Sequence, residues 1–260
     1  MTMEFRADEH ASNLNPGAAR SGGGRIVVCV GGPTREEALD QIVLAGTLAD
    51  LVELRLDRIA GARPEELIPA SPVPVIATVR TRREGGDWER PDAACAGLLA
   101  RALDAGAACV DVEFGLPERL RKELAKQAGP GRVILSRHTT RHTPSTEVLT
   151  ELLETMARER PAVVKIVCRA RTASDVFRVL ALIPRAGTLG VGVSAFCMGA
   201  AGRTSRLLSL RLGASLGYAA LIEGGETAEG QIPVSEMQRM LSNAPLQPDI
   251  NPLFEMGGSP

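Results

Sequence analysis

The sequence predicts a single (β/α)8 TIM barrel of the α/β class. Eight short runs rich in β-branched residues alternate with amphipathic stretches that are long enough to cross back over a parallel sheet as helices. A chain of 260 residues that is 44% hydrophobic can bury one large core. Periodicity alone leaves an open, doubly wound sheet as the alternative. We expect the barrel to span residues 25–242, between a disordered, Gly-rich tail at 1–24 and a C-terminal extension at 243–260.

The eight expected strands coincide with short apolar runs. In chain order they are IVVCV from Ile26, DLVELRLD from Asp50, VPVIATVR from Val73, ACVDVEF from Ala108, RVILS from Arg132, AVVKIVC from Ala162, TLGVGVS from Thr188 and YAALI from Tyr218. The stretches between them have helical periodicity, and a last helix is expected near Val234 to Leu241. Residues that favour helix N-caps begin several of these helices: Thr34, Asp92, Ser145 and Thr172.

The overall charge argues against several classes of partner. With 30 basic and 31 acidic residues the net charge is −1, so neither nucleic acid nor an anionic membrane surface is expected as a partner. Apolar runs are far shorter than the roughly 20 residues that cross a bilayer. The first 25 residues lack the charged-then-apolar order of a secretory signal. We therefore expect a cytoplasmic protein that acts on a small-molecule substrate.

The cysteine, histidine and glycine patterns argue against bound metals, disulfides and nucleotides. The five cysteines form no CxxC pair, and one of the three histidines, His10, lies in the expected tail. Neither GxGxxG after a strand nor GxxxxGK(S/T) occurs. We expect no metal centre, no disulfide and no nucleotide cofactor.

Lys165 is the residue whose position most needs a chemical reason. Only three of the 30 basic residues are lysines, and this one lies within the apolar run AVVKIVC. A desolvated lysine becomes a neutral amine that can attack a carbonyl carbon and form a Schiff base. A buried lysine can equally pair with a carboxylate or extend its ammonium to solvent. The run itself leaves both interpretations open.

Charged residues recur two positions apart on two other expected strands, which places each pair on one face of its strand. For Glu53 and Arg55 we favour contact with a ligand that carries hydroxyls and a carboxylate. For Asp111 and Glu113 we favour an interior ion-pair network.

Three further segments follow the ends of expected strands, where barrel enzymes carry their functional residues. His138 follows the strand before Lys165, a place where an imidazole suits a general base beside an imine. The loop after the seventh strand begins a helix near Thr204, and Arg206 supplies a bidentate group for an anion there. A second polar loop, residues 224–231, follows the eighth strand.

Together these segments resemble the type I 3-dehydroquinate dehydratases, which are Schiff-base enzymes of the shikimate pathway. The motifs that carry the resemblance keep their order over residues 26–242. They are ELRLD at 53–57, TVRTRREGG at 78–86, DVE at 111–113, SRHTTRHTP at 136–144, VVKI at 163–166, MGAAGRTSR at 198–206 and EGQI at 229–232. This ordered set is more specific than any one of its motifs.

The resemblance implies that the protein dehydrates 3-dehydroquinate to 3-dehydroshikimate without a metal or organic cofactor. It implies that Lys165 forms the imine, that His138 acts as base and acid, and that Glu84 orients His138. It also implies a homodimer. The residues implied to bind the substrate are Glu53, Arg55 and Arg80 at the ring hydroxyls, Arg206 and Gln231 at the carboxylate, and Thr227 in the last loop.

Three positions depart from the usual pattern of that family. Thr139 stands where members usually have Asp, Glu229 where they have Pro, and Cys29 where the first strand often has Ser. The loss of Pro would loosen the last loop, and Glu229 would add a negative charge near an anionic substrate. The sequence also leaves two other functions open. One is an imine-forming aldolase or transaldolase that acts on sugar phosphates, and the other is a non-catalytic barrel that senses a quinate-like ligand.

Overall fold

Strands and helices alternate through residues 24–242, the part of the chain that the computed structural model describes. The tail predicted at 1–24 and the extension predicted at 243–260 lie outside these residues, apart from Gly24. The strands are β1 (Arg25–Val30), β2 (Leu51–Arg55), β3 (Val75–Thr78), β4 (Cys109–Glu113), β5 (Val133–Thr139), β6 (Val163–Arg169), β7 (Gly192–Met198) and β8 (Leu216–Ala220). The helices are α2 (Arg35–Gly46), α3 (Pro64–Leu67), α4 (Asp92–Asp104), α5 (Glu118–Ala128), α6 (Thr146–Ala157), α7 (Ala173–Leu180), α8 (Leu182–Thr188), α9 (Ser205–Arg211) and α10 (Val234–Ser242), with 3-10 turns η2 (Ile68–Ala70), η3 (Arg82–Glu84) and η4 (Ala200–Gly202).

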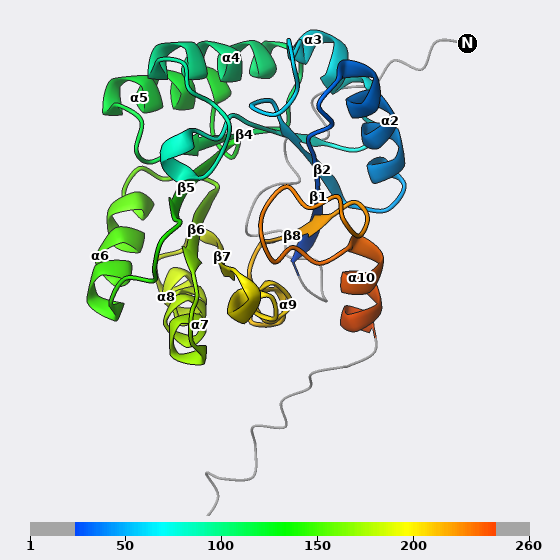
Figure 1. Cartoon of the computed structure of the whole chain (residues 1–260). Coiled ribbons are helices and arrows are strands. Elements are labelled where there is room, and N and C mark those ends of the chain that lie inside the picture. Colours follow the sequence, from blue (N-terminus) through cyan, green and yellow to red (C-terminus); the bar gives the residue numbers. More distant parts are fainter. Residues whose placement is uncertain (1–23, 243–260) are drawn as a thin grey trace, which may run out of the picture.

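The eight strands form a nearly closed parallel barrel, as the sequence predicts. Neighbouring strands are hydrogen-bonded in the order β7-β6-β5-β4-β3-β2-β1-β8, and the helices surround them (Figure 1). β7 and β8 meet through two 2.7 Å bonds, in which Ser215 N donates to Val193 O and Ser194 Oγ donates to Leu216 O. The open, doubly wound sheet is therefore the wrong alternative.

Strand side chains divide between two apolar cores because successive residues point to opposite faces of the sheet. Outward residues such as Val28 and Leu54 pack between the strands and the helices. Inward residues such as Val27, Ile76 and Ile134 fill the floor of the barrel. Buried polar side chains take inward positions nearer the C-terminal ends of the strands, so the polar site lies on an apolar floor.

Three of the four predicted helix caps are confirmed. Thr34, Ser145 and Thr172 each accept a hydrogen bond from a backbone N–H in the first turn of the helix that follows. The prediction for Asp92 is wrong, because Pro91 takes the N-cap position and the Asp92 carboxylate binds Arg83 at 2.5 Å instead. Over residues 24–242, no helix has the length and apolar content that a membrane span requires.

Several strand boundaries differ from the prediction by one or two residues, and β8 begins at Leu216 rather than at Tyr218. Two larger differences bear on the site. β5 extends to Thr139, so His138 belongs to the strand rather than to the loop after it. β7 covers Gly192–Met198 instead of 188–194, because the chain through Thr188 is still helical and turns at Gly190 with a φ of 67°. The start of the expected loop, from Phe196 to Met198, is therefore strand.

Candidate active site

One cavity opens at the C-terminal ends of the strands. It collects most of the side chains that the sequence predicts for the site: Glu53, Arg55, Arg80, His138, Lys165, Arg206, Thr227 and Gln231. The remaining one, Glu84, does not line the cavity and contacts the His138 ring instead. The barrel thus brings together residues from β2, β5, β6 and α9 and from the segments that follow β3 and β8.

Lys165 lies in this cavity between two carboxylates. Its side chain is buried, and Nζ lies 3.1 Å from Glu53 Oε1 and 3.0 Å from Asp111 Oδ2. Burial alone would raise the pKa of Glu53, but the charges of Lys165 and Arg55 and the hydrogen bond from Cys29 together outweigh it, so the pKa lies below its ordinary value. Lys165 is therefore paired with carboxylates, and because it also lines a cavity that a ligand can share, this pairing is compatible with imine formation.

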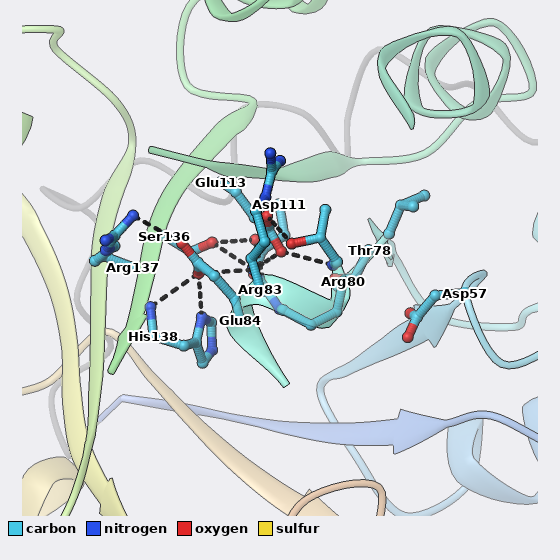
Figure 2. Close-up of polar contacts among 12 residues, drawn as sticks. Asp57, Thr78, Arg80, Arg83, Glu84, Asp111, Glu113, Ser136, Arg137 and His138 are labelled. Atoms are coloured by element: carbon cyan, nitrogen blue, oxygen red, sulfur yellow. Dashed lines mark hydrogen bonds and ion pairs between the residues drawn. The ribbon is translucent and has the colours of Figure 1, made fainter. Parts of the chain in front are cut away.

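Arg80 organises the ion pairs on the β3–β5 side of the cavity (Figure 2). Its guanidinium lies 2.8 Å from Asp111 Oδ1 and 3.2 Å from Glu113 Oε1, and it donates to Ser136 Oγ at 2.9 Å. Glu113 also accepts from the backbone N–H and the hydroxyl of Thr81. The interior network predicted for Asp111 and Glu113 is confirmed, and Asp111 extends it to the lysine.

Glu84, the last residue of the turn η3, contacts both the backbone and the ring of His138 (Figure 2). Glu84 Oε2 accepts a 2.9 Å bond from the His138 backbone N–H and lies 3.0 Å from Nδ1. Burial lowers the pKa of His138 well below its ordinary value, and the charges of Arg80 and Lys165 add to this effect. Burial also raises the pKa of Glu84 to about 7. The imidazole is therefore neutral at neutral pH, and Nε2 remains as the nitrogen available to the cavity.

Arg206 is a buried cation without a counterion. Its residue is 1% exposed, and no carboxylate among residues 24–242 forms an ion pair with it. Nη2 donates to Glu229 O at 3.2 Å, while Nε is buried without a hydrogen-bond partner in this part of the chain. Burial lowers the pKa of Arg206 to about 10, so it still carries its charge at neutral pH. A buried guanidinium in this state is suited to an anionic ligand.

The loop after β8 closes over one side of the cavity. Gln231 Oε1 accepts hydrogen bonds from Thr227 N at 2.7 Å and Ala228 N at 3.2 Å, so the two ends of this loop segment are bonded to each other. Gln231 Nε2 lies 3.1 Å from Cys29 Sγ on β1. At the rim, the Glu229 carboxylate pairs with Arg169 at the end of β6 at 2.5 Å. Arg169 thus neutralises the negative charge of Glu229, which stands where the family usually has Pro.

Several contacts in the site were not predicted from the sequence. Asp57 forms a bidentate pair with Arg55, at 2.9 and 2.7 Å, and its position two residues later in the motif ELRLD was the available signal. Cys29 Sγ donates to Glu53 Oε2 at 3.0 Å. Phe196 and Tyr218 line the cavity as well. The single tyrosine of the chain was visible in the sequence, but nothing there placed its ring beside Lys165.

Comparison with known proteins identifies the family. The family model described as type I 3-dehydroquinase matches residues 26–245. The chain belongs to this family. Among curated relatives, the 3-dehydroquinate dehydratase of Desulfotalea psychrophila is 33% identical over 226 residues, covering 85% of this chain and 98% of that one. That of Thermococcus gammatolerans is 40% identical over 197 residues, covering 74% and 87%.

A solved 3-dehydroquinate dehydratase structure has the same fold. The 3-dehydroquinate dehydratase of Enterococcus faecalis superposes with a TM-score of 0.74 at 25% identity, covering 86% of this chain and 96% of that chain. The resemblance seen in the motifs is thereby confirmed for this type I 3-dehydroquinase. Family membership favours a dehydratase over the aldolase-type and sensor alternatives.

Proposed function

We propose that this type I 3-dehydroquinase dehydrates 3-dehydroquinate to 3-dehydroshikimate with Lys165 as the imine-forming nucleophile and His138 as the acid and base. The observation that carries the assignment is one cavity that holds a lysine amine, a neutral imidazole and a buried arginine without a counterion. These three groups match a substrate with a ketone, an acidic C–H bond and a carboxylate.

Imine formation begins when the Lys165 ammonium gives a proton to the neutral His138 ring. The free amine attacks the ketone carbon and forms a carbinolamine. The former ketone oxygen then leaves as water with the proton that His138 holds, and a protonated imine remains. Its positive charge replaces that of the ammonium between Glu53 and Asp111, whose oxygens lie within 3.1 Å of Nζ.

Dehydration follows from the acidity of the carbon beside the imine. His138 removes a proton from that carbon, and the C–H electron pair neutralises the iminium as an enamine. The enamine expels the hydroxyl on the next carbon, which leaves as water with the proton from His138. Water then hydrolyses the conjugated imine and restores the Lys165 ammonium. Glu84, 3.0 Å from Nδ1, fixes the ring and stabilises the imidazolium in both steps.

Substrate binding is assigned to the cations and amide around these two residues. The buried guanidinium of Arg206 and the amide of Gln231 hold the carboxylate. Glu53, Arg55 and Arg80 contact the ring hydroxyls from β2 and the end of β3. Arg55 Nη1 now donates to Thr227 O at 3.3 Å, so a substrate hydroxyl takes over this weak bond when the loop adjusts.

A continuous absorbance assay tests the proposal, because dehydration converts a ketone into a conjugated enone. We expect the protein to generate enone absorbance from 3-dehydroquinate, and we expect Arg206→Leu to raise KM at least about tenfold because a buried charge partner is lost. The matched control is Arg158→Leu, which removes an exposed arginine of the α6 C-terminus. Absence of enone formation, or equal KM values in the two variants, contradicts the assignment.

We also propose that residues 25–242 form the catalytic domain and that two such domains pair as a homodimer. The described elements run from Arg25 to Ser242. The exposed apolar side chains of Phe177 on α7 and Val148 on α6 supply apolar area for a contact between two copies. Light scattering after size exclusion is expected to give twice the mass of the chain, and the mass of one chain would contradict the dimer.

A cytoplasmic location is part of the same proposal. All five cysteines are buried free thiols, as is usual for proteins of reducing compartments. Cell fractionation is expected to recover the activity with cytoplasmic markers, and recovery with periplasmic or secreted markers would overturn this assignment.

A further inference from the structure

Two aromatic rings connect the lysine with the arginine in the cavity. Lys165 Nζ lies 3.7 Å from the centroid of the Tyr218 ring on β8. The Tyr218 and Phe196 ring centroids are 5.8 Å apart, with an angle of 40° between the planes. The guanidinium carbon of Arg206 lies 4.6 Å from the centroid of Phe196, on β7. A cation therefore lies against each end of a pair of neighbouring rings.

Aromatic residues are few in this chain, and two of them line the cavity. The sequence has one tyrosine, one tryptophan and five phenylalanines, and two of these seven side chains lie in the cavity. Tyr218 is 2% exposed and Phe196 is 3% exposed. The Tyr218 hydroxyl is buried without a hydrogen-bond partner among residues 24–242. The contact of Tyr218 with Lys165 is made by the face of its ring.

The face of an aromatic ring carries negative potential and attracts a cation, most strongly where water is excluded. The lysine nitrogen loses its positive charge when the amine attacks and the carbinolamine forms, and it regains the charge in the protonated imine. A ring face against that nitrogen therefore favours collapse of the neutral carbinolamine to the charged imine. An aliphatic side chain of similar size would fill the same volume without this attraction.

We propose that Tyr218 and Phe196 are positioning residues for the imine reaction. The ring face of Tyr218 stabilises the positive charge on Lys165 Nζ. Its contact with Phe196 fixes the spacing between that nitrogen and the Arg206 guanidinium, and hence the distance between ketone and carboxylate that a substrate must have. This inference rests on the roles assigned to Lys165 and Arg206 under the proposed function.

Graded fluorination of the ring tests the electrostatic part. Fluorine weakens the negative potential of the ring face while the volume changes little. Tyr218→Phe serves as the reference, and residue 218 is then replaced by 4-fluoro-, 3,5-difluoro- and 3,4,5-trifluorophenylalanine. We expect kcat to fall stepwise, to about one tenth of the reference in the last variant, because a desolvated ring face is lost. The melting temperature should stay constant across the series.

The same substitutions at Phe114 provide the control, since this phenylalanine does not line the cavity and its ring faces the guanidinium of Arg121 at 4.8 Å. They should leave kcat unchanged. A series at residue 218 with equal kcat values would overturn the electrostatic role.

Phe196→Leu tests the spacing. We expect KM for 3-dehydroquinate to rise about tenfold, with a smaller change in kcat, because Arg206 loses the ring that supports it. An unchanged KM would overturn the spacing role. Borohydride reduction of the unmodified protein with 3-dehydroquinate distinguishes failure of the proposed function from failure of the role of the rings. If no adduct forms on Lys165, the proposed function fails. If the adduct forms and both tests are negative, only the role of the rings fails.

Discussion

The half of the site that the strands carry and the half that the loop after β8 carries are held in different ways. Lys165 on β6 and Arg80 at the end of β3 are 3% and 4% exposed and each lies within 3.2 Å of buried carboxylates. In the loop half, Gln231 bonds mainly to backbone N–H groups of its own loop. The ion pair of that half, Glu229 with Arg169, has side chains that are 55% and 34% exposed.

This difference implies that the two halves of the site have different roles. Buried ion pairs in a closed sheet hold reacting groups in fixed geometry, and removing one partner leaves an uncompensated charge. An exposed pair is screened by salt and contributes little. We therefore expect changes in the strand half to affect the chemical step and stability, and changes in the loop half to affect substrate binding.

The largest effect is expected for Lys165→Met, which removes the amine at similar volume. kcat should fall at least about a thousandfold, as expected when a covalent nucleophile is lost. Unfolding free energy should fall by about 3–5 kcal/mol, because Glu53 and Asp111 would face each other without a cation. The absorbance assay and urea unfolding measure the two effects. Lys126→Met, in the helix α5, is the control, and a comparable loss there would contradict the comparison.

The next largest effect is expected for His138→Asn. Its kcat should be about 10²- to 10⁴-fold lower, because the group that acts as acid and base is lost. The variant should still form a borohydride-reducible adduct, because the amine remains, but more slowly, because the group that accepts the ammonium proton is lost. His142→Asn removes an exposed histidine four residues on and should leave kcat unchanged. If His138→Asn retains full activity, the assignment of the acid and base is wrong.

Glu84→Gln should change how stability depends on pH. The folded pKa of Glu84, about 7, lies above its ordinary value of 4.5, so between these values the folded state holds a proton that the unfolded state has lost. This contribution is fully present below pH 4.5 and is lost as pH rises to 7, by roughly 3 kcal/mol. The variant should lack this loss in urea unfolding at pH 5 and pH 8.

His138 titrates in the opposite sense, because its folded pKa is lowered and its contribution grows as pH rises through the unfolded value. The difference between the original protein and Glu84→Gln isolates the carboxyl. An identical pH dependence in the two proteins would show that Glu84 is not the group responsible.

The smallest effect is expected in the loop half, for Glu229→Gln. The exposed pair with Arg169 contributes at most about 1 kcal/mol, so KM should change no more than about fivefold and kcat should stay the same. Added salt should shift the KM of the original protein toward that of the variant. Glu223→Gln, an exposed glutamate earlier in the same loop, is the control. A kcat loss comparable with that of His138→Asn would contradict the division into two halves.

The strand half was also the easier half to predict from the sequence. Glu53 and Arg55, two residues apart on an apolar strand, had to share a face, and both line the cavity. The start of β7 was misplaced because the helix α8 precedes it within a run of apolar residues and glycine. Contacts made by closure of the barrel were missed for another reason. The bond of Gln231 to Cys29 joins residues 202 positions apart, and no local pattern specifies such a pair.

The most direct test of the central claim is the intact mass of the protein after reaction with 3-dehydroquinate and borohydride, followed by peptide mapping. The account predicts one reduced ligand per chain, attached to Lys165 and absent from Lys165→Met. An unmodified protein, or an adduct on Lys122 or Lys126, would contradict the claim that Lys165 forms the imine.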